Sequence, residues 1–453
     1  MSQAIGIDAA HRRVIFASSL GTVFEWYDFY LYGTLAVFFS ALFFPPGNET
    51  AAFLASLATF GAGFAVRPLG ALLFGRLGDR VGRKHTFLIT IVVMGLSTAL
   101  VGVLPTYAQI GIWAPILLVT LRLAQGLALG GEYGGAATYV AEHAPPGRRG
   151  YYTSWIQTTA TLGFFLSLAV ILACRIGFGE EAFRTWGWRL PFLLSVVLLG
   201  VSVYIRLKLE ESPVFAEMKA EGGLSHAPLT ESFGRWANAR IVLLALFGAT
   251  AGQGVVWYTG QFYALFFLQN TLKLDFQTSY VLIALALLIG TPFFVFFGRL
   301  SDRLGRKKIM VAGCLLAALT FIPIFHGLTH AVNPALAEFE QRAAITVAGE
   351  DCHVHIFTKP KSGCDLARDF LTKAGVSYLR LPRDGDHDVV TTIGTSRLEG
   401  FNETAYRAEL RANGYPETAD TTRLNLPAAL ALLVVLMIYV TMVYGPIAAY
   451  LVE

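Results

Sequence analysis

Long apolar runs separated by short polar loops dominate this chain. An α-helix rises ~1.5 Å per residue, so roughly 20 apolar residues are needed to cross the ~30 Å hydrocarbon core of a membrane. Each run of that length predicts a transmembrane helix, and ten are present: 14–42, 52–74, 86–105, 111–141, 152–174, 187–206, 241–269, 278–298, 309–328 and 426–452. The pattern therefore predicts an all-α integral membrane protein.

The polar segments divide the chain further. We expect a tail at 1–13, a six-helix bundle at 14–206, a linker at 207–240, three helices of a second bundle at 241–328, a polar insert at 329–425 and a tenth helix at 426–453. Within the insert, alternating runs and helix-like stretches predict a small α+β unit: 344–357, 365–374, 376–381 and 403–413.

Composition supports this class, and charge orients the chain. Hydrophobic residues make up 55% and charged residues 15% of the chain, the mean hydropathy is +0.55, and the net charge is +4. With the N-terminus inside, the short outside loops hold only four basic residues, namely Arg175, Arg184, Arg189 and Lys273. Because basic loops stay in the cytoplasm, we expect an inner-membrane protein with a cytoplasmic N-terminus and a periplasmic insert.

An internal repeat marks two related halves. The segment Gly75–Lys84 (GRLGDRVGRK) recurs as Gly298–Lys307 (GRLSDRLGRK), an offset of 298 − 75 = 223 residues. A fainter pair matches Gly134–Glu142 with Gly445–Glu453. In the first half two helices follow Glu142, so the repeat predicts that the native chain continues beyond Glu453 by roughly 70–100 residues.

Both loop copies resemble the signature of the major facilitator superfamily. The signature positions are Gly75, Asp79 and Arg83 in the first copy, and Gly298, Asp302 and Arg306 in the second. Further local motifs resemble its metabolite:H+ symporter branch: EWYDFYLYG (25–33), RPLG (67–70), RLAQG (122–126), GGE (130–132), WGWRLPF (186–192) and ESPVF (211–215). The resemblance implies two bundles around a central cavity, with the last two of twelve helices absent, and gating by the two loops.

Five ionisable residues fall inside the first four predicted spans. They are Glu25, Asp28, Arg67, Arg122 and Glu132. Each central charge costs about 2.5–3.5 kcal/mol on insertion scales, so these side chains must face one another or a wet cavity. Three acids against two arginines leave one acid for a proton, and Asp28 and Arg122 both lie near mid-depth, where they can pair. The alternative is that these charges only lock helices together.

Polar residues within apolar runs complete the candidate pathway for substrate and proton. They are Tyr32, Gln125, Gln157, Gln253, Tyr258 and Gln261, and the alternative is that they bond to one another. Gly126 and Gly130 lie one turn apart on the fourth predicted helix, which indicates close helix packing.

Two of the four cysteines lie in the insert. Outside the cytoplasm, Cys352 and Cys364 would form a disulfide. The alternative is a metal site of Cys352, His353 and His355, but its spacing matches no familiar zinc pattern. We expect neither a metal nor another cofactor.

The predicted function is secondary active transport, with proton-coupled import of a small organic acid or zwitterionic metabolite. The expected partners are the substrate, protons and the lipid bilayer, without nucleic acid. The alternatives are an uncoupled facilitator or exporter of the same superfamily, and a membrane sensor that uses the insert. The sequence contains no catalytic constellation, so we expect no enzyme activity.

Overall fold

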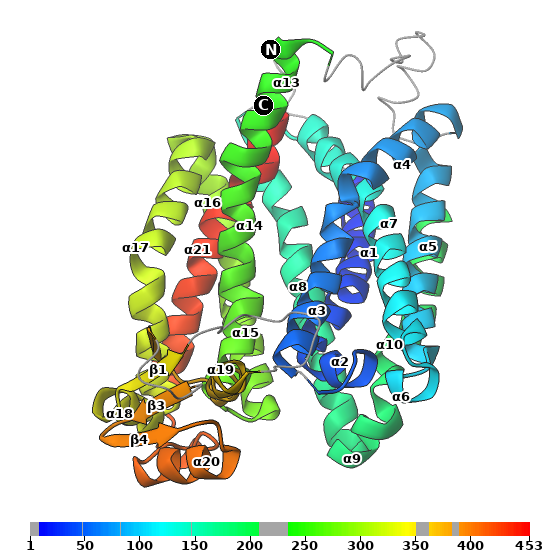
Figure 1. Cartoon of the computed structure of the whole chain (residues 1–453). Coiled ribbons are helices and arrows are strands. Elements are labelled where there is room, and N and C mark those ends of the chain that lie inside the picture. The colour runs from blue at the N-terminus through cyan, green and yellow to red at the C-terminus, as the bar shows by residue number, and fades with distance from the viewer. Residues whose placement is uncertain are drawn as a thin grey trace.

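The computed structural model describes the backbone of residues 9–47, 49–81, 83–145, 147–207, 234–349, 362–382 and 389–453. Within those ranges, some side chains lie outside the described part: 9–20, 78–85, 87, 132–139, 142–143 and 206. Long helices run side by side, with the insert at one end of the molecule and the C-terminus at the other (Figure 1). We call these ends the insert face and the C-terminal face.

Helices make up the first half of the chain. They are α1 (Ala9–Thr34), α2 (Ala36–Phe43), α3 (Glu49–Ala65), α4 (Arg67–Val81), α5 (Arg83–Val103), α6 (Tyr107–Ile110), α7 (Trp113–His143), α8 (Arg149–Phe178), α9 (Glu180–Ala182), η1 (Phe183–Gly187) and α10 (Arg189–Leu207). The second predicted span is divided between α3 and α4 at Val66. The break precedes Pro68, which has no backbone N–H and fits best in the first turn of a helix.

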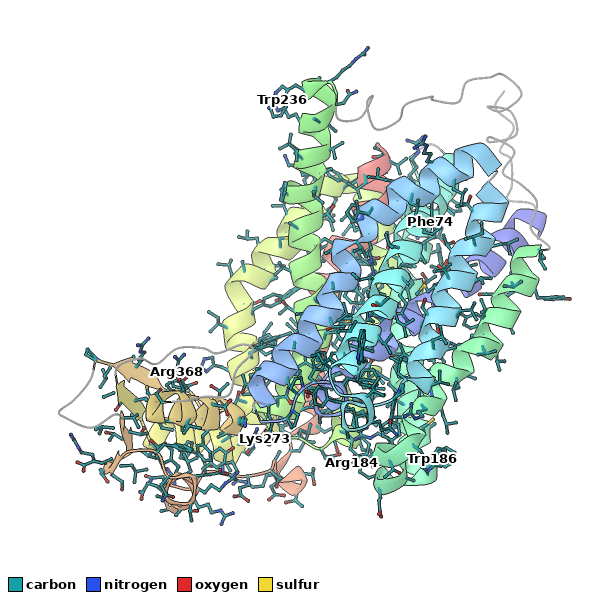
Figure 2. The ribbon with its side chains drawn as sticks, turned by 45° about the vertical axis from the view of Figure 1, so that its right-hand side comes forward. Phe74, Arg184, Trp186, Trp236, Lys273 and Arg368 are labelled. Carbon is teal, nitrogen blue, oxygen red and sulfur yellow. The ribbon has the colours of Figure 1, made fainter. Side chains whose placement is uncertain are left out.

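The second half contains a long span with an irregular backbone. The irregular span consists of α13 (Trp236–Leu243), η2 (Leu244–Thr250), α14 (Ala251–Tyr258), η3 (Thr259–Tyr263), α15 (Ala264–Phe266) and η4 (Phe267–Thr271). The other long helices of this half are α16 (Phe276–Leu304), α17 (Arg306–Val332) and α21 (Leu426–Val452). The irregular span begins at Trp236 and ends at Thr271, and Lys273 lies just beyond that end (Figure 2). Its three stretches η2, η3 and η4 are π-helical, and wide turns of this kind often occur at functional sites.

Seven helices in the described residues are long and apolar enough to span a membrane, or eight if the bent pair Glu180–Gly187 and Arg189–Ile205 counts as one span. The shorter apolar helix Leu88–Val103 falls in another predicted run. All ten predicted runs are helical, but their number as membrane spans stays a prediction. Large apolar side chains such as Phe247, Leu319 and Ile322 are exposed on the outside of the bundle, as a lipid-facing surface requires.

Helix α7 packs closely on the divided second span through two glycines. A Cβ atom at Gly126 would lie 2.0 Å from the Gly63 carbonyl oxygen, and one at Gly130 would lie 2.2 Å from that of Arg67. Any larger residue would push the helices apart. The close packing predicted for these two glycines is therefore confirmed.

The two halves meet where α16 crosses the start of α8. A Cβ atom at Gly150 would lie 2.5 Å from the Gly298 carbonyl oxygen, and one at Gly298 would lie 2.5 Å from Ser154 Cβ. Near the insert face, the Tyr280 hydroxyl donates to the Thr34 carbonyl at 3.3 Å. Contacts between the halves therefore occur toward both ends of the bundle.

The region between α17 and α21 forms the insert. It contains α18 (Pro334–Arg342), β1 (Ile345–Gly349), α19 (Gly363–Ala374), β2 (Leu379–Leu381), β3 (Val389–Ile393), β4 (Ser396–Glu399), α20 (Glu403–Ala412) and the 3-10 turn η5 (Thr421–Arg423). The four strands form one sheet in the order β2-β1-β3-β4, with β1 parallel to β2 and antiparallel to β3. The amphipathic helices α19 and α20 occupy the two stretches that the sequence pattern marks as helical.

Candidate functional site

Arg122 on α7 is the most deeply buried cation of the bundle's described side chains. Its side chain is 0% exposed, and its Nη1 donates to Gln125 Oε1 at 2.5 Å and to the Phe29 carbonyl at 3.3 Å. Among the described residues, Nε and Nη2 have no hydrogen-bond partner. Burying an arginine with unused donors is costly, so these two N–H groups are available for a ligand.

Aromatic rings surround this guanidinium. Its carbon Cζ lies 4.4 Å from the ring centre of Phe29, 4.7 Å from that of Tyr32 and 5.3 Å from that of Phe60. Such contacts stabilise a buried cation without neutralising it. Gln125 is fixed in turn, since its Nε2 donates to Thr98 Oγ1 at 2.8 Å.

Arg67 approaches the same aromatic group from the divided span. Its Cζ lies 4.1 Å from the ring centre of Phe64 and 4.5 Å from that of Phe29. Phe29 therefore contacts both guanidinium groups.

Asp28 does not form the expected pair with Arg122. Its Oδ1 instead accepts a 2.5 Å hydrogen bond from Ser195 Oγ on α10, and among the described side chains no carboxylate lies within 4 Å of Arg122. The reason is the rotation of α1, which presents Phe29 to α7 and Asp28 to α10. The neighbouring Tyr27 hydroxyl donates to the Pro191 carbonyl, also on α10, at 2.7 Å.

The residues predicted on one face of α1 also separate. The Tyr32 hydroxyl donates to the Ser56 carbonyl on α3 at 3.0 Å, away from the Ser195 contact. Glu25 is buried on α1, and the Glu132 side chain lies outside the described residues. Asp28 is therefore separated from Arg122, and the wider cluster of acids and arginines stays a prediction.

An aromatic group joins the two halves beside Arg122. Tyr30 stacks on Trp257 at 5.3 Å between ring centres, and Phe164 stacks on Phe262 at 4.5 Å. Phe60, which contacts Arg122, also contacts Phe262 at 5.3 Å. One ring therefore separates the guanidinium from the second half.

The second half contributes polar atoms to this group from the π-helical turn η3 and the residues before it. Gln261 is 0% exposed, and neither its amide nitrogen nor its amide oxygen has a hydrogen-bond partner among the described residues. The same holds for Trp257 Nε1. Tyr258, predicted from the sequence, packs on Phe64 at 5.1 Å, next to Arg67. Arg122 and the rings that contact it, Phe29, Tyr32 and Phe60, form what we call the central site.

The remaining polar candidates lie at different depths. Gln157 is fully buried on α8, and Gln253 is half-buried on α14. The sequence reasoning did not select Ser195 or Trp257. Ser195 is one of two serines in the apolar run of α10, and Trp257 directly precedes Tyr258, so polarity within an apolar run could have indicated both.

The second signature loop binds the first half. Both carboxylate oxygens of Asp302 accept backbone hydrogen bonds at the start of α8, from Gly150 N at 2.8 Å and Tyr151 N at 2.9 Å. Arg306 forms ion pairs with Asp302 at 2.9 Å and with Glu453 at 2.8 Å. A carboxylate at a helix N-terminus satisfies unpaired N–H groups and favours the helix dipole. In the first loop, the side chains of Asp79 and Arg83 lie outside the described residues.

The insert cysteines are only partly described. Cys364 is buried and disulfide-bonded, whereas Cys352 lies outside the described residues, so their pairing stays a prediction. His353 and His355, the other members of the alternative metal site, also lie outside them. Within the described residues, no group of three or more His, Cys, Asp or Glu side chains is placed to hold a metal ion.

Comparisons with known proteins consistently match this chain to membrane transporters. Residues 14–229 match the family described as sugar (and other) transporter. The glycine betaine/proline/ectoine/pipecolic acid transporter of Dickeya dadantii is 38% identical over 331 residues, which are 70% of this chain and 65% of that protein. An inner membrane metabolite transport protein of Escherichia coli is 39% identical over 341 residues, 72% of this chain and 75% of that protein.

The shikimate transporter of Escherichia coli is 37% identical over 326 residues, covering 70% of this chain and 72% of that protein. The match to the Dickeya protein spans just under two thirds of that relative's length. Among solved structures, a D-xylose–proton symporter superposes with a TM-score of 0.55 at 19% identity, over 71% of this chain and 75% of that chain. At this identity the likeness shows the fold alone.

Proposed function

Because this chain belongs to the major facilitator superfamily of membrane transporters, we propose that it moves a small carboxylate-bearing metabolite across the bacterial inner membrane, driven by protons. The observation that carries this proposal is Arg122, a fully buried guanidinium with two unused N–H donors. A planar guanidinium binds a carboxylate through two parallel hydrogen bonds.

The chemistry named for the relatives agrees with such a site. Relatives are named as transporters of glycine betaine, proline, shikimate and alpha-ketoglutarate. These compounds differ in charge and shape, but each has a carboxylate. A central arginine suits this shared group, while the aromatic rings around it would select the remainder of the molecule.

We assign Asp28 as the group that binds the coupling proton. It is buried on α1, and Ser195 is its hydrogen-bond donor. In the described part of the chain, no Lys, Arg or His nitrogen lies within 4 Å of its carboxylate. A buried carboxylate without a cation costs several kcal/mol when ionised. Taking up a proton removes that cost, so protonation would couple to movements of α1.

The contacts between the halves support an alternating mechanism. Asp302 caps α8 toward the C-terminal face, and Tyr280 contacts Thr34 toward the insert face. We propose that these two sets of contacts open in turn, so that the central site faces one side at a time. In this scheme the C-terminal face is cytoplasmic and the insert face is periplasmic.

Uptake into vesicles tests the proposal. The full chain is reconstituted with an imposed proton gradient and offered radiolabelled glycine betaine, proline, shikimate and alpha-ketoglutarate in turn. We expect at least one to accumulate above its external concentration and to leak out after a protonophore is added. If a compound equilibrates across the membrane without accumulating, the protein is an uncoupled facilitator. If none of the four compounds enters the vesicles, the carboxylate assignment is contradicted.

A further inference from the structure

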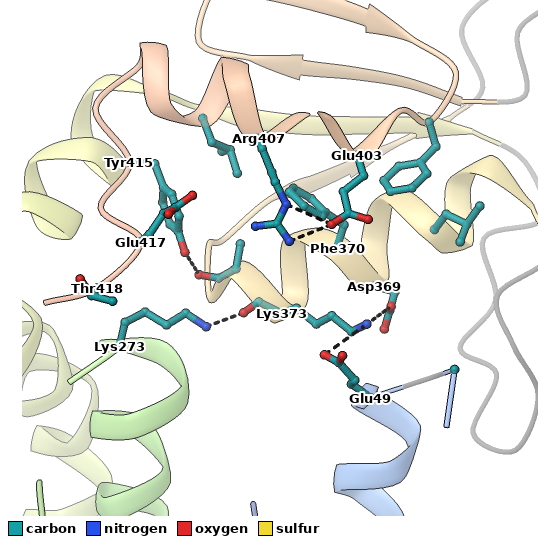
Figure 3. A pocket seen from close by; sticks show the side chains of 15 residues that line it. Glu49, Lys273, Asp369, Phe370, Lys373, Glu403, Arg407, Tyr415, Glu417 and Thr418 are labelled. Atoms are coloured by element: carbon teal, nitrogen blue, oxygen red, sulfur yellow. Dashed lines mark hydrogen bonds and ion pairs between the residues drawn. The ribbon is translucent and has the colours of Figure 1, made fainter. Parts of the chain in front are cut away.

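A charged cavity lies on the insert face, where the insert contacts both membrane halves. Its volume is about 610 Å³, within the range typical of small-molecule sites. The wall residues come from the start of α3, the loop before α16, and α19 and α20 of the insert (Figure 3). Phe370, Phe401 and Leu410 supply apolar surface, so the cavity has both charged and apolar walls.

Lys273 is the unusual residue of this cavity. Its Nζ donates to the Lys373 carbonyl at 2.5 Å, and its own carbonyl accepts from Ala419 N at 3.1 Å. Among the described residues, no carboxylate lies within 4 Å of Lys273 Nζ. An ammonium has three donors, so this partly buried cation retains capacity for an anion. Burial also lowers the pKa of Lys273 below its usual value.

The backbone at Lys273 gives a second, independent observation. Its φ angle is 55°, and it is the one non-glycine residue with positive φ in the described chain. A lysine gains nothing locally from this left-handed conformation, which asparagine or glycine adopts more readily. Such outliers cluster at binding sites, where the surroundings hold them in place.

The opposite charge lies along α19. Lys373 Nζ contacts Asp369 at 3.0 Å and Glu49 of α3 at 3.5 Å, so two carboxylates share one ammonium. The remaining charges that line the cavity are matched, because Arg407 pairs with Glu403 at 2.8 Å and Glu417 with Arg411 at 2.5 Å. The cavity therefore has one unpaired cation on one side and one excess carboxylate on the other.

We propose that this cavity is a second binding site, which takes a small zwitterion. The ligand's carboxylate contacts Lys273, and its cationic end contacts Asp369 and Glu49. Because Glu49 belongs to the first half and Lys273 to the second, a bound ligand bridges the halves through the insert. The site goes beyond the proposed function, since it is built from the insert and does not include Arg122.

Protection of Lys273 from an amine-acylating reagent tests this site directly. The purified full chain is labelled under limiting reagent, and acylation of Lys273 is followed by peptide mass spectrometry with Lys307 as the internal reference. Glycine betaine is the zwitterionic probe, and acetate and tetramethylammonium carry its two charges separately. We expect about tenfold slower labelling of Lys273 at a betaine concentration ten times its Kd, because only the empty site reacts.

Variants test the contact between the cationic end of the ligand and the two carboxylates. Asp369→Asn and Glu49→Gln should weaken protection by betaine, whereas Glu399→Gln on β4, outside the cavity, should leave it unchanged. Arg122→Gln should abolish uptake but leave the protection intact, which separates this site from the proposed transport site. If betaine does not slow the acylation of Lys273 in the wild-type chain, the proposal is overturned. Equal protection by acetate would overturn the zwitterion assignment, and lost protection in Arg122→Gln would show that the central site causes it.

Discussion

At the scale of single residues, α1 separates two kinds of chemistry. Its Phe29 carbonyl and ring contact Arg122 on α7, while Asp28, one residue earlier, bonds to Ser195 on α10. Adjacent residues on a helix point about 100° apart, so they reach different neighbours. In the proposed mechanism, substrate and proton therefore act on two sides of one helix, and their coupling passes through its movement.

This arrangement predicts the effect of neutralising Asp28. Asp28→Asn keeps the size of the side chain but removes the exchangeable charge, so uptake driven by a proton gradient should fall to the level of passive exchange. Counterflow, which needs no net proton movement, should continue. Both are measured with labelled substrate in the same vesicles. Accumulation by Asp28→Asn at the wild-type level would assign the proton elsewhere.

Ser195 provides a graded test of the same idea. Ser195→Ala removes the hydrogen bond to Asp28, and a hydrogen bond to a charged group contributes about 1.5–3 kcal/mol. The pH dependence of uptake should therefore shift in this variant. Ser202→Ala, two turns further along the same helix, is the matched control and should leave the pH profile unchanged.

The sequence could identify the buried charges but not their partners. Membrane depth follows from position within an apolar run, which places Asp28 and Arg122 correctly inside the bundle. Pairing depends on how far each helix is rotated about its axis. A rotation of α1 by one residue, about 100°, decides whether Asp28 faces α7 or α10. The aromatic contacts of Arg122 were equally hidden, because Phe29 and Phe60 resemble ordinary lipid-facing residues in a sequence rich in phenylalanine.

At the scale of elements, the two signature loops share a sequence but not an environment. A Cβ atom at Gly298 would meet Ser154 and Gly150 of α8, whereas no atom of the described residues lies within 4 Å of one at Gly75. The repeat predicted the two loops and their places after the second helix of each half. It could not predict which glycine is crowded, since that depends on the neighbouring helix.

This difference predicts opposite effects of one substitution. Gly298→Ala overpacks the crossing of α16 and α8 and should lower the free energy of unfolding by about 1–3 kcal/mol. Gly75→Ala lies in an open stretch of α4 and should raise it by about 0.5–1 kcal/mol, because alanine favours the helix. The midpoints of thermal unfolding in detergent compare the two. Equal shifts in both variants would contradict the described contact.

At the scale of the whole molecule, the insert and the signature loops lie at opposite ends of the bundle (Figure 1). The distribution of basic residues predicts which end faces the cytoplasm. The polar pattern also indicated a separate folded unit between the ninth and tenth predicted helices. Its contacts with the membrane helices, such as Lys373 with Glu49, join residues more than 300 positions apart and have no signal in the sequence.

Labelling of single cysteines tests this orientation. In a chain with all four native cysteines replaced by serine, Glu399→Cys on the insert should react with a membrane-impermeant maleimide in intact cells. Lys307→Cys, beside the second signature loop, should react only after the cells are lysed. The reverse pattern would place the insert in the cytoplasm and invert the proposed direction of transport.

The most direct test of the central claim is whether Arg122 recognises a carboxylate. Equilibrium binding is measured for an accumulated substrate and for its carboxamide, in which a neutral amide replaces the carboxylate. Lys273→Asn is present throughout so that the insert cavity does not contribute. With Arg122 intact, the acid should bind about 10- to 100-fold more tightly than the amide, as expected for hydrogen bonds between charged groups. In Arg122→Gln this preference should disappear. An undiminished preference in Arg122→Gln would show that the carboxylate binds elsewhere.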